Sequence, residues 1–177
     1  MDFYELITKR QSERQYDTRQ VESEKIMQCI EAARLAPSAC NAQPWKFIVI
    51  DEPELKKQLA SAIAGMGMNK FAFDAPVIVA IVLEKPNVTS KIGSVLKGKE
   101  YTLIDVGIAA VHFCLQATYL GLGTCIIGWF DEKKVRKLLQ IPNKKRIPLL
   151  LTVGYSNAEV RNKQRKELNV MYSANKY

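Results

Sequence analysis

The sequence predicts an α+β fold in which helices flank a central mixed or antiparallel sheet. Residues 75–83 read Ala-Pro-Val-Ile-Val-Ala-Ile-Val-Leu, the nearly continuous apolar run of a central strand covered on both faces. Residues 103–120 are longer and apolar around most of a helical circumference, which indicates a buried helix. Strand-like and helix-like segments alternate along the rest of the chain. This alternation predicts a layered fold.

The N-terminal part of the chain should contribute two helices. Residues 3–9 carry apolar side chains at helical spacing and predict a short helix that ends close to Arg10. Residues 23–35 form an amphipathic segment, which we expect Ser23 to cap and Pro37 to terminate. A polar loop follows directly.

A strand and a further helix come next. Residues 45–50 are rich in aromatic and β-branched side chains, which favours a strand. Residues 53–64 read as a helix that the glycines at 65–67 interrupt. Residues 84–100 are polar and weakly patterned, so we expect a mobile loop or short helix there, acting as a lid over a substrate pocket.

The buried helix at 103–120 has an implication for assembly. A chain of this size can hardly surround such an apolar helix alone, so we expect a second subunit to cover part of it. Gly121-Leu122-Gly123 should end the helix. Residues 155–177 have few apolar side chains, and we expect this tail to end by wrapping over something other than its own core. The remaining expected elements are a short strand at 124–127, a basic amphipathic helix at 131–139 and a core strand at 147–154.

Length and composition indicate a single folded domain spanning residues 1–177. The chain has 177 residues, of which 47% are hydrophobic and 25% charged, as in ordinary soluble proteins. Its first residues lack the basic and apolar regions of a secretory signal, so we expect a cytoplasmic protein. Polar residues and glycines interrupt the most apolar stretch, and no membrane span is expected. The four cysteines contain no CxxC pair, which favours reduced thiols.

The net charge of +8 permits several kinds of anionic partner. Basic clusters occur at residues 133–137 and 144–146, but neither is interleaved with the aromatic side chains that stack on single-stranded bases. We interpret both clusters as solvated surface and expect no nucleic-acid partner. A basic nucleic-acid-binding protein remains an alternative that charge alone does not exclude.

Two sequence motifs carry the functional prediction. In the first, Arg10-Gln11-Ser12-Glu13-Arg14, two guanidinium groups flank a hydroxyl, a donor set that suits a bound phosphate. In the second, residues 37–45 read Pro-Ser-Ala-Cys-Asn-Ala-Gln-Pro-Trp, which predicts a polar loop with turn conformations before a strand.

These motifs resemble those of the nitroreductase family of FMN enzymes. Further matches in the family's order lie at Asp74-Ala75-Pro76, at residues 121–128, and at Lys163 and Arg165 in the tail, so the resemblance covers nearly the whole chain. It implies an interlocked homodimer with two FMN molecules at the subunit interface. It also implies that the C-terminal segment crosses to the partner.

The resemblance assigns roles to individual residues. Arg10 and Ser12 would bind the FMN phosphate or ribityl chain, and Lys163 and Arg165 would close on the phosphate. Arg14 would lie beside the pyrimidine edge of the flavin, where a fixed positive charge stabilises the anion formed on hydride transfer. The complete implied cofactor-binding set is Arg10, Gln11, Ser12, Arg14, Pro37, Ser38, Ala39, Asn41, Asn69, Ile127, Gly128, Lys163 and Arg165.

Within that set, Ser38, Ala39 and Asn41 would contact the flavin edge and ring from the partner subunit. Asn69 would hydrogen-bond the pyrimidine face. Ile127 and Gly128 would lie beneath the flavin, where a backbone N–H points at N5 and small size permits close approach.

The implied activity is hydride transfer from NADH or NADPH through FMN to nitroaromatic, quinone or related electron-poor small molecules. Alternatives left open are a flavin-binding protein without nicotinamide turnover, and a relative that fragments flavins or removes halogens. The physiological acceptor, the preference between NADH and NADPH, and the proton donor are not readable from the residues.

Other residues invite competing interpretations. Lone His112 lies on an apolar helix and is expected to be a hydrogen-bonded core or interface residue, so no metal site is predicted. We expect Cys40 to pack and not to act as a nucleophile, because no basic partner is near it in sequence. Glycines 121, 123 and 128 do not have the spacing of a dinucleotide-binding motif.

Overall fold

The centre of the molecule is an antiparallel sheet. The computed structural model describes residues 1–85 and 99–177, and in this part of the chain four strands pair in the order β1-β2-β4-β3. The strands are β1 (Trp45–Ile50), β2 (Val77–Leu83), β3 (Gly123–Ile127) and β4 (Leu149–Gly154). All three pairings are antiparallel. A single parallel bridge joins Ser12 to Thr124 at the β3 edge.

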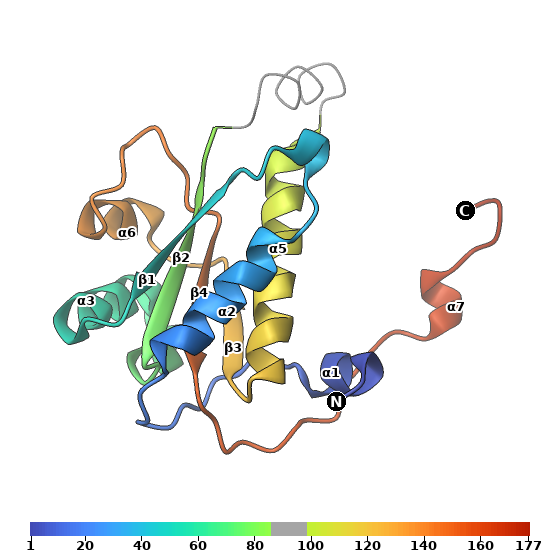
Figure 1. Ribbon diagram of the computed structural model, residues 1–177, viewed down its shortest axis with the longest axis horizontal. Helices are drawn as coiled ribbons and strands as arrows, with labels where there is room; N and C mark the ends of the chain where they lie inside the picture. Colours follow the sequence, from blue (N-terminus) through green and yellow to red (C-terminus); the bar gives the residue numbers. More distant parts are fainter. Residues whose placement is uncertain (86–98) are drawn as a thin grey trace.

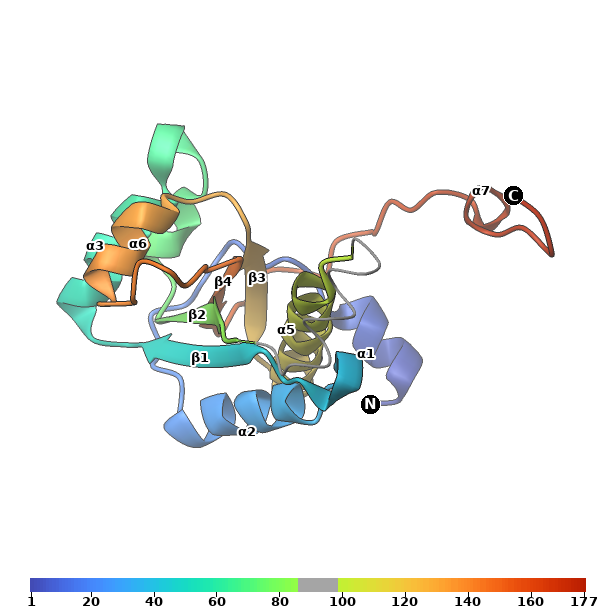
Figure 2. The same cartoon turned by 90° about the horizontal axis from the view of Figure 1, so that it is seen from above.

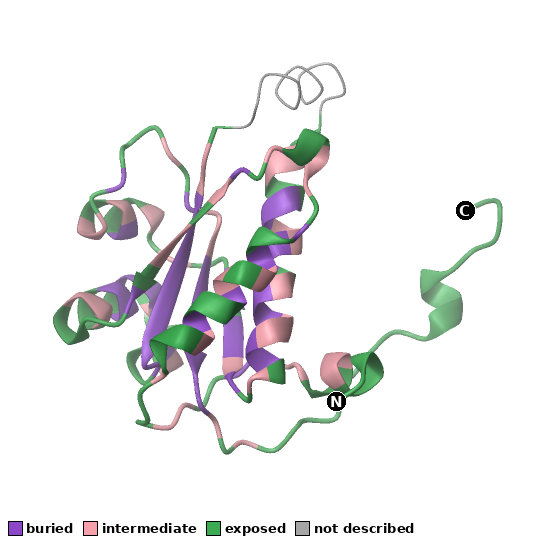
Figure 3. Cartoon of the chain, viewed as in Figure 1, coloured by how far each residue is buried: buried purple, intermediate pink, exposed green. Residues whose placement is uncertain are grey.

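Helices cover both faces of this sheet, as the sequence predicts (Figures 1 and 2). α2 (Ser23–Arg34) and α5 (Tyr101–Tyr119) lie on one face, whereas α3 (Pro53–Ile63) and α6 (Glu132–Leu138) lie on the other. Alternate side chains of β2 belong to two different cores, with Val79 packed towards α2 and α5 and Ile78 towards α3 and α6. The central strand is therefore buried on both sides (Figure 3).

α5 ends where the glycine pattern predicts. Gly121 adopts a left-handed conformation with φ of +79°, which glycine accepts without strain. The amide of Leu122 donates to the carbonyl of Ala117 at 2.8 Å, and the amide of Gly121 donates to the carbonyl of Thr118 at 3.1 Å. These two bonds form a Schellman motif, which satisfies the last carbonyls of the helix and turns the chain into β3.

α5 is only half covered by its own chain. Its inner side packs on α2 and the sheet, but Ile104, Val111 and Tyr119 are exposed along its outer side. By length and composition α5 is the one described helix that could cross a membrane, a weak indication because the core helix of a soluble protein meets the same test. An exposed apolar stripe on a central helix agrees with our expectation that another subunit covers it.

Some local predictions need correction. Ser23 does not cap α2, because it is the first helical residue, and Glu22 occupies the cap position without a side-chain cap bond. The Glu22 carboxylate accepts instead from the Tyr155 hydroxyl at 2.5 Å. In α3, Glu52 caps the helix by accepting from two backbone amides, and in α6 Asp131 accepts from the backbone amide of Lys134. α2 and α3 begin at the expected residues and end one residue earlier, whereas α6 begins one residue later than expected because Asp131 is its cap.

The C-terminal segment leaves the body of the molecule. Residues 155–177 run past α1 (Phe3–Lys9) and continue outward to α7 (Leu168–Met171), far from the sheet (Figures 1 and 2). Leu168, Val170 and Tyr172 are exposed, and α7 has no buried residue (Figure 3). We call residues 166–177 the C-terminal arm. The lid expected at 84–100 falls mainly on residues 86–98, which lie outside the described residues.

Candidate cofactor site

The two ends of the chain meet in a pocket of about 290 Å³ that is rich in positive charge. Its lining residues are Arg10, Gln11, Ser12, Arg14, Arg161, Asn162, Lys163 and Arg165. We call this the cationic pocket. It contains the phosphate donors implied by the resemblance, although about 150 residues separate the two segments in sequence.

The N-terminal side of the cationic pocket is held by the sheet edge. The amide of Glu13 donates to the carbonyl of Thr124 at 2.8 Å, which aligns residues 12–13 beside β3. The buried Glu13 carboxylate accepts from the amides of Arg14 at 2.8 Å and Gln15 at 3.1 Å. Because these contacts fix the backbone on both sides of Glu13, Ser12 and Arg14 are presented in one defined orientation.

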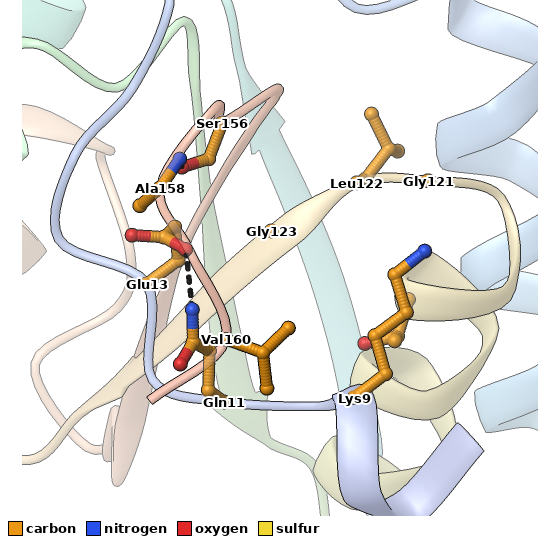
Figure 4. Close-up of a pocket in the computed structure, with 10 residues that line it drawn as sticks. Lys9, Gln11, Glu13, Gly121, Leu122, Gly123, Ser156, Ala158 and Val160 are labelled. Carbon is orange, nitrogen blue, oxygen red and sulfur yellow. Dashed lines mark hydrogen bonds between the residues drawn. The ribbon is translucent and has the colours of Figure 1, made fainter. Parts of the chain in front are cut away.

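A close approach of β3 makes this arrangement possible. A Cβ atom at Gly123 would lie 2.7 Å from Cγ of Glu13, so only glycine leaves room for the Glu13 side chain. The hydroxyl of Tyr16 also donates to the Glu13 carbonyl at 3.1 Å. Figure 4 shows Glu13, Gln11 and Gly123 around an adjacent small cavity of about 80 Å³.

Gln11 fastens the C-terminal segment to the N-terminal one. Its amide nitrogen donates to the carbonyl of Glu159 at 3.2 Å, and its oxygen accepts from the Arg161 amide at 3.1 Å and the Arg161 guanidinium at 3.2 Å. The same guanidinium donates to the carbonyl of Ser12. Gln11 thereby holds residues 159–161 so that Lys163 and Arg165 can complete the pocket.

Lys163 shows that the pocket is electrostatically incomplete. Its ammonium nitrogen is buried and finds no hydrogen-bond partner within the described ranges 1–85 and 99–177. Burial, followed by repulsion from Arg10, Arg165 and Arg161, lowers the pKa of Lys163. A buried cation without a partner is costly unless an anion is bound beside it. The donor set of guanidinium, ammonium and hydroxyl groups fits a phosphate dianion.

A second group of implied residues lies near the pocket. The Arg14 guanidinium lies over the ring of Phe71, with its central carbon 5.9 Å from the centroid. Asn69, two residues earlier, donates from its side chain to the carbonyl of Trp129 at 3.2 Å. Trp129 follows Gly128 directly, so these contacts gather Arg14, Asn69 and the end of β3. The Ile127 side chain is buried, whereas the adjoining Gly128 is exposed.

The loop that contains Pro37, Ser38, Ala39 and Asn41 lies elsewhere in the chain. The amide of Ala39 donates to Asp105 near the start of α5, whereas Gln11 lies beside Thr118 near its end. At 1.5 Å per residue, these places are roughly 20 Å apart along the helix. A single chain does not bring the loop to its own cationic pocket, as expected if the partner subunit supplies it.

Comparison with known proteins identifies the relatives of this chain. The family model described as nitroreductase family matches residues 7–67 and 64–155, which is more than half of the sequence. The chain belongs to the nitroreductase family.

Individual relatives support this membership. A putative NAD(P)H nitroreductase of Streptococcus pyogenes is 32% identical over 89% of this chain and 91% of its own length. An oxygen-insensitive NADPH nitroreductase of Helicobacter pylori is 29% identical over 92% of this chain and 91% of its own length. The crystal structure of an FMN-dependent nitroreductase from Clostridium difficile superimposes with a TM-score of 0.79, at 28% identity over 97% and 98% of the two chains.

The family assigns this nitroreductase to the NAD(P)H-dependent oxidoreductases. Its members are FMN enzymes, and the donor set of the cationic pocket is chemically suited to a phosphate group such as that of FMN. When bound, FMN supplies the two-electron chemistry, accepting hydride from a nicotinamide and passing electrons to an acceptor.

Sequence reasoning missed Glu13, which supports Ser12 and Arg14, and two residues that line the cationic pocket, Arg161 and Asn162. Arg161 lines it with Lys163 and Arg165. The spacing Arg-x-Lys-x-Arg carries a signal for this, because alternate side chains of an extended segment point the same way. Glu13 carries no comparable signal. An acidic residue between two basic ones is expected to be exposed, and only the packing of β3 against it shows that it is buried.

Other predictions concern cysteine, histidine and metals. The prediction that Cys40 packs is wrong for this chain, in which Cys40 is exposed. Cys29 and Cys114 are buried in the core, and burial raises the pKa of their thiols to about 12 and about 11. His112 bonds the Ile108 carbonyl at 2.9 Å, as expected of a core or interface histidine. No cluster of three or more His, Cys, Asp or Glu side chains suited to a metal occurs among the described residues.

Proposed function

We propose that this nitroreductase is an FMN-dependent enzyme that takes hydride from NADH or NADPH and reduces electron-poor small molecules such as nitroaromatics and quinones. One observation carries the proposal. Lys163 buries an ammonium group without a partner among the described residues, inside a pocket that also contains four guanidinium groups. The phosphate of FMN would neutralise this concentration of charge.

The residues of the cationic pocket would hold FMN by its phosphate and ribityl chain. Arg10 and Arg165 offer planar pairs of donors, Lys163 offers a point charge, and Ser12 offers a hydroxyl. Arg161 would add a further positive charge while keeping its bonds to Gln11 and Ser12. This division of labour suits a doubly charged anion better than a neutral ligand.

Arg14 would act on the ring end of the cofactor. Its contact with Phe71 and its bonded backbone support a fixed orientation for the guanidinium. A fixed cation beside the flavin would stabilise the negative charge that develops during reduction. Asn69 and the backbone at Ile127 and Gly128 would complete the surroundings of the ring.

The site would be shared between two subunits of a homodimer. The exposed apolar side of α5 and the exposed arm both require cover, and a second copy would supply it. The loop with Pro37, Ser38, Ala39 and Asn41 would reach the partner's FMN. The proposal treats residues 1–177 as one FMN-binding domain of a cytoplasmic protein, without a nucleic-acid or membrane partner.

An anaerobic reduction experiment tests this function. The purified protein should carry FMN, give a dimer in light scattering, and lose flavin absorbance when NADH or NADPH is mixed in a stopped-flow cell. Addition of a nitroaromatic, quinone or halogenated acceptor should restore the absorbance of the oxidised flavin, and the fastest acceptor identifies the substrate class.

Three outcomes would contradict the proposal. Bound FMN that a nicotinamide cannot bleach would favour a flavin-binding protein without turnover. Stoichiometric loss of FMN to smaller products would favour a flavin-fragmenting relative. A colourless protein that binds oligonucleotides with strong salt dependence would favour the nucleic-acid alternative.

A further inference from the structure

The loop at residues 37–43 has a strained backbone. Cys40, Asn41 and Gln43 have φ values of 52°, 52° and 45°, in the left-handed region that residues other than glycine rarely adopt. Within the loop, the Gln43 amide donates to Ser38 Oγ at 3.0 Å. The Gln43 side chain donates to Asn41 Oδ1, also at 3.0 Å. Such conformations persist only where the surroundings hold them.

Asp105 on α5 supplies an external hold. Its Oδ1 accepts a hydrogen bond from the Ala39 amide at 3.0 Å, directly before the strained residues. Asp105 is 3% exposed, so water competes little for this contact. A charge-assisted bond in such surroundings is stronger than a neutral one.

Asp105 is costly to keep in this position. Its Oδ2 is buried and has no hydrogen-bond partner in the described ranges of the chain. It also interrupts a helix that is otherwise apolar on its inner side, next to Val106 and Ala109. A residue that served only to fill space here would be apolar, so the carboxylate is best explained by its action on the loop.

We propose that Asp105 is a positioning residue that holds Ser38, Ala39 and Asn41 in the geometry required at the partner's flavin. This inference rests on the proposed function, because it assumes that the loop reaches an FMN. α5 then links the two halves of the chemistry: its start holds the loop for one site, and its end turns into β3, which supports Glu13 and Arg14 of the other. A helix of 19 residues spans about 28 Å and transmits this spacing rigidly.

Three variants test the inference. Asp105→Ala removes the acceptor for the Ala39 amide. Asp105→Asn keeps an oxygen in the same place without the charge. Phe113→Leu makes a cavity in the core at a position of α5 eight residues after Asp105, so it is the control for general destabilisation.

The first measurement uses protein without cofactor. Hydrogen exchange of the amides at residues 39–43 should be much faster in Asp105→Ala than in wild type, and near the wild-type rate in Asp105→Asn. Phe113→Leu should lower the melting temperature without a selective effect on these amides. Equal exchange in Asp105→Ala and wild type would overturn the inference, whatever ligand the protein binds.

The second measurement uses the FMN-loaded dimer. Asp105→Ala should alter the visible spectrum of the flavin and slow its reduction about tenfold or more, because small displacements in a site are costly. Asp105→Asn should recover most of the rate, while FMN affinity changes little in either variant. An unchanged spectrum and rate in Asp105→Ala would refute the inference, whereas a wild-type protein inert to NADH and NADPH would refute the proposed function instead.

Asp105→Glu covers the case in which Asp105→Ala does not fold. It retains the charge but moves the carboxylate by one methylene group, so the loop must shift. The inference then requires an altered flavin spectrum and faster exchange at residues 39–43. Wild-type values for both would overturn it.

Discussion

The cationic pocket and the basic surface of α6 both concentrate positive residues but differ in how the charges of those residues are stabilised. On α6 and the following loop, Arg146 pairs with Glu132 at 2.9 Å, Lys145 pairs with Glu84, and Arg136 donates to the carbonyl of Asn143 at 2.8 Å. Lys133, Lys137 and Lys144 are exposed. In the pocket, Lys163 is partly buried, and its ammonium nitrogen has no hydrogen-bond partner among the described residues.

The difference teaches that the environment of a charge is more informative than its presence. Exposed or paired cations need nothing further, since water or a carboxylate already stabilises them. In the cationic pocket several positive groups lie close together and one of them is shielded from water. A bound anion is needed to stabilise such a group. The sequence interpretation of the α6 clusters as solvated surface agrees with these contacts.

The largest expected effect comes from the buried ammonium. Lys163→Met preserves the length of the side chain but removes the charge, so FMN should bind about a hundredfold more weakly, the upper range for a charged hydrogen bond. Equilibrium dialysis of FMN measures this. Lys144→Met, at an exposed lysine, is the matched control. If both variants bind FMN equally well, the contrast between the two basic regions has no functional meaning.

Arg14 should affect rate more than retention. Arg14→Ala removes the cation that we propose faces the flavin while the backbone bonds to Glu13 remain, so flavin reduction should slow by about tenfold to a hundredfold. Anaerobic stopped-flow measures the rate, and circular dichroism checks that the fold is kept. Wild-type reduction in this variant would remove Arg14 from the chemistry.

Arg165 should show the reverse pattern. It lines the pocket but is exposed, so Arg165→Ala should weaken FMN binding by about tenfold and leave the reduction rate of loaded enzyme nearly unchanged. Titration of the cofactor-free protein with FMN gives the affinity. If Arg165→Ala slowed flavin reduction and left the affinity for FMN intact, the roles proposed for Arg14 and Arg165 would have to be exchanged.

The lowered pKa of Lys163 predicts a pH dependence of stability. Burial and neighbouring cations lower the folded-state pKa below the ordinary value of 10.5, so the unfolded chain binds more protons over the interval between the two values. The stability of the cofactor-free protein should therefore rise with pH as that interval is approached and crossed. Urea unfolding of wild type and Lys163→Met across this range isolates the contribution, which the variant should lack.

The smallest effect should come from the α6 surface. Replacement of Lys133 and Lys137 by alanine lowers the net charge by two but removes no cation from the pocket, so FMN affinity should stay within about twofold of wild type. A loss as large as that of Lys163→Met would mean that general charge, and not the pocket, attracts the cofactor.

Most elements of the fold were predictable because their signals are local. The helix at Phe3–Lys9 and the strand at Trp45–Ile50 have the predicted limits, and the glycine stop after α5 forms the expected motif. The cap of α2 was not predictable, since Glu22 is engaged by Tyr155 from the far end of the chain. Local propensity cannot anticipate a contact made across 133 residues.

The site was predictable in part. The resemblance brought Arg10, Ser12 and Lys163 to one expected phosphate site, and the structure gathers all three in one pocket. Arg161 and Glu13 were missed, because their roles depend on Gln11 and on the sheet edge. The role proposed for Asp105 has no signal in the sequence, because its hydrogen bond with Ala39 joins residues 66 positions apart.

The amino-acid sequence alone determined the order of helices and strands, the family resemblance and the presence of side chains suited to a phosphate, because these follow from periodicity, turn chemistry and motif composition. Only the tertiary structure decided which charged groups are paired or solvated and which are enclosed without a partner. That distinction depends on burial and on partners distant in sequence, since the free energy of a charge is set by its surroundings. The same reason separates Lys163 from Lys144, two residues that the sequence presents alike.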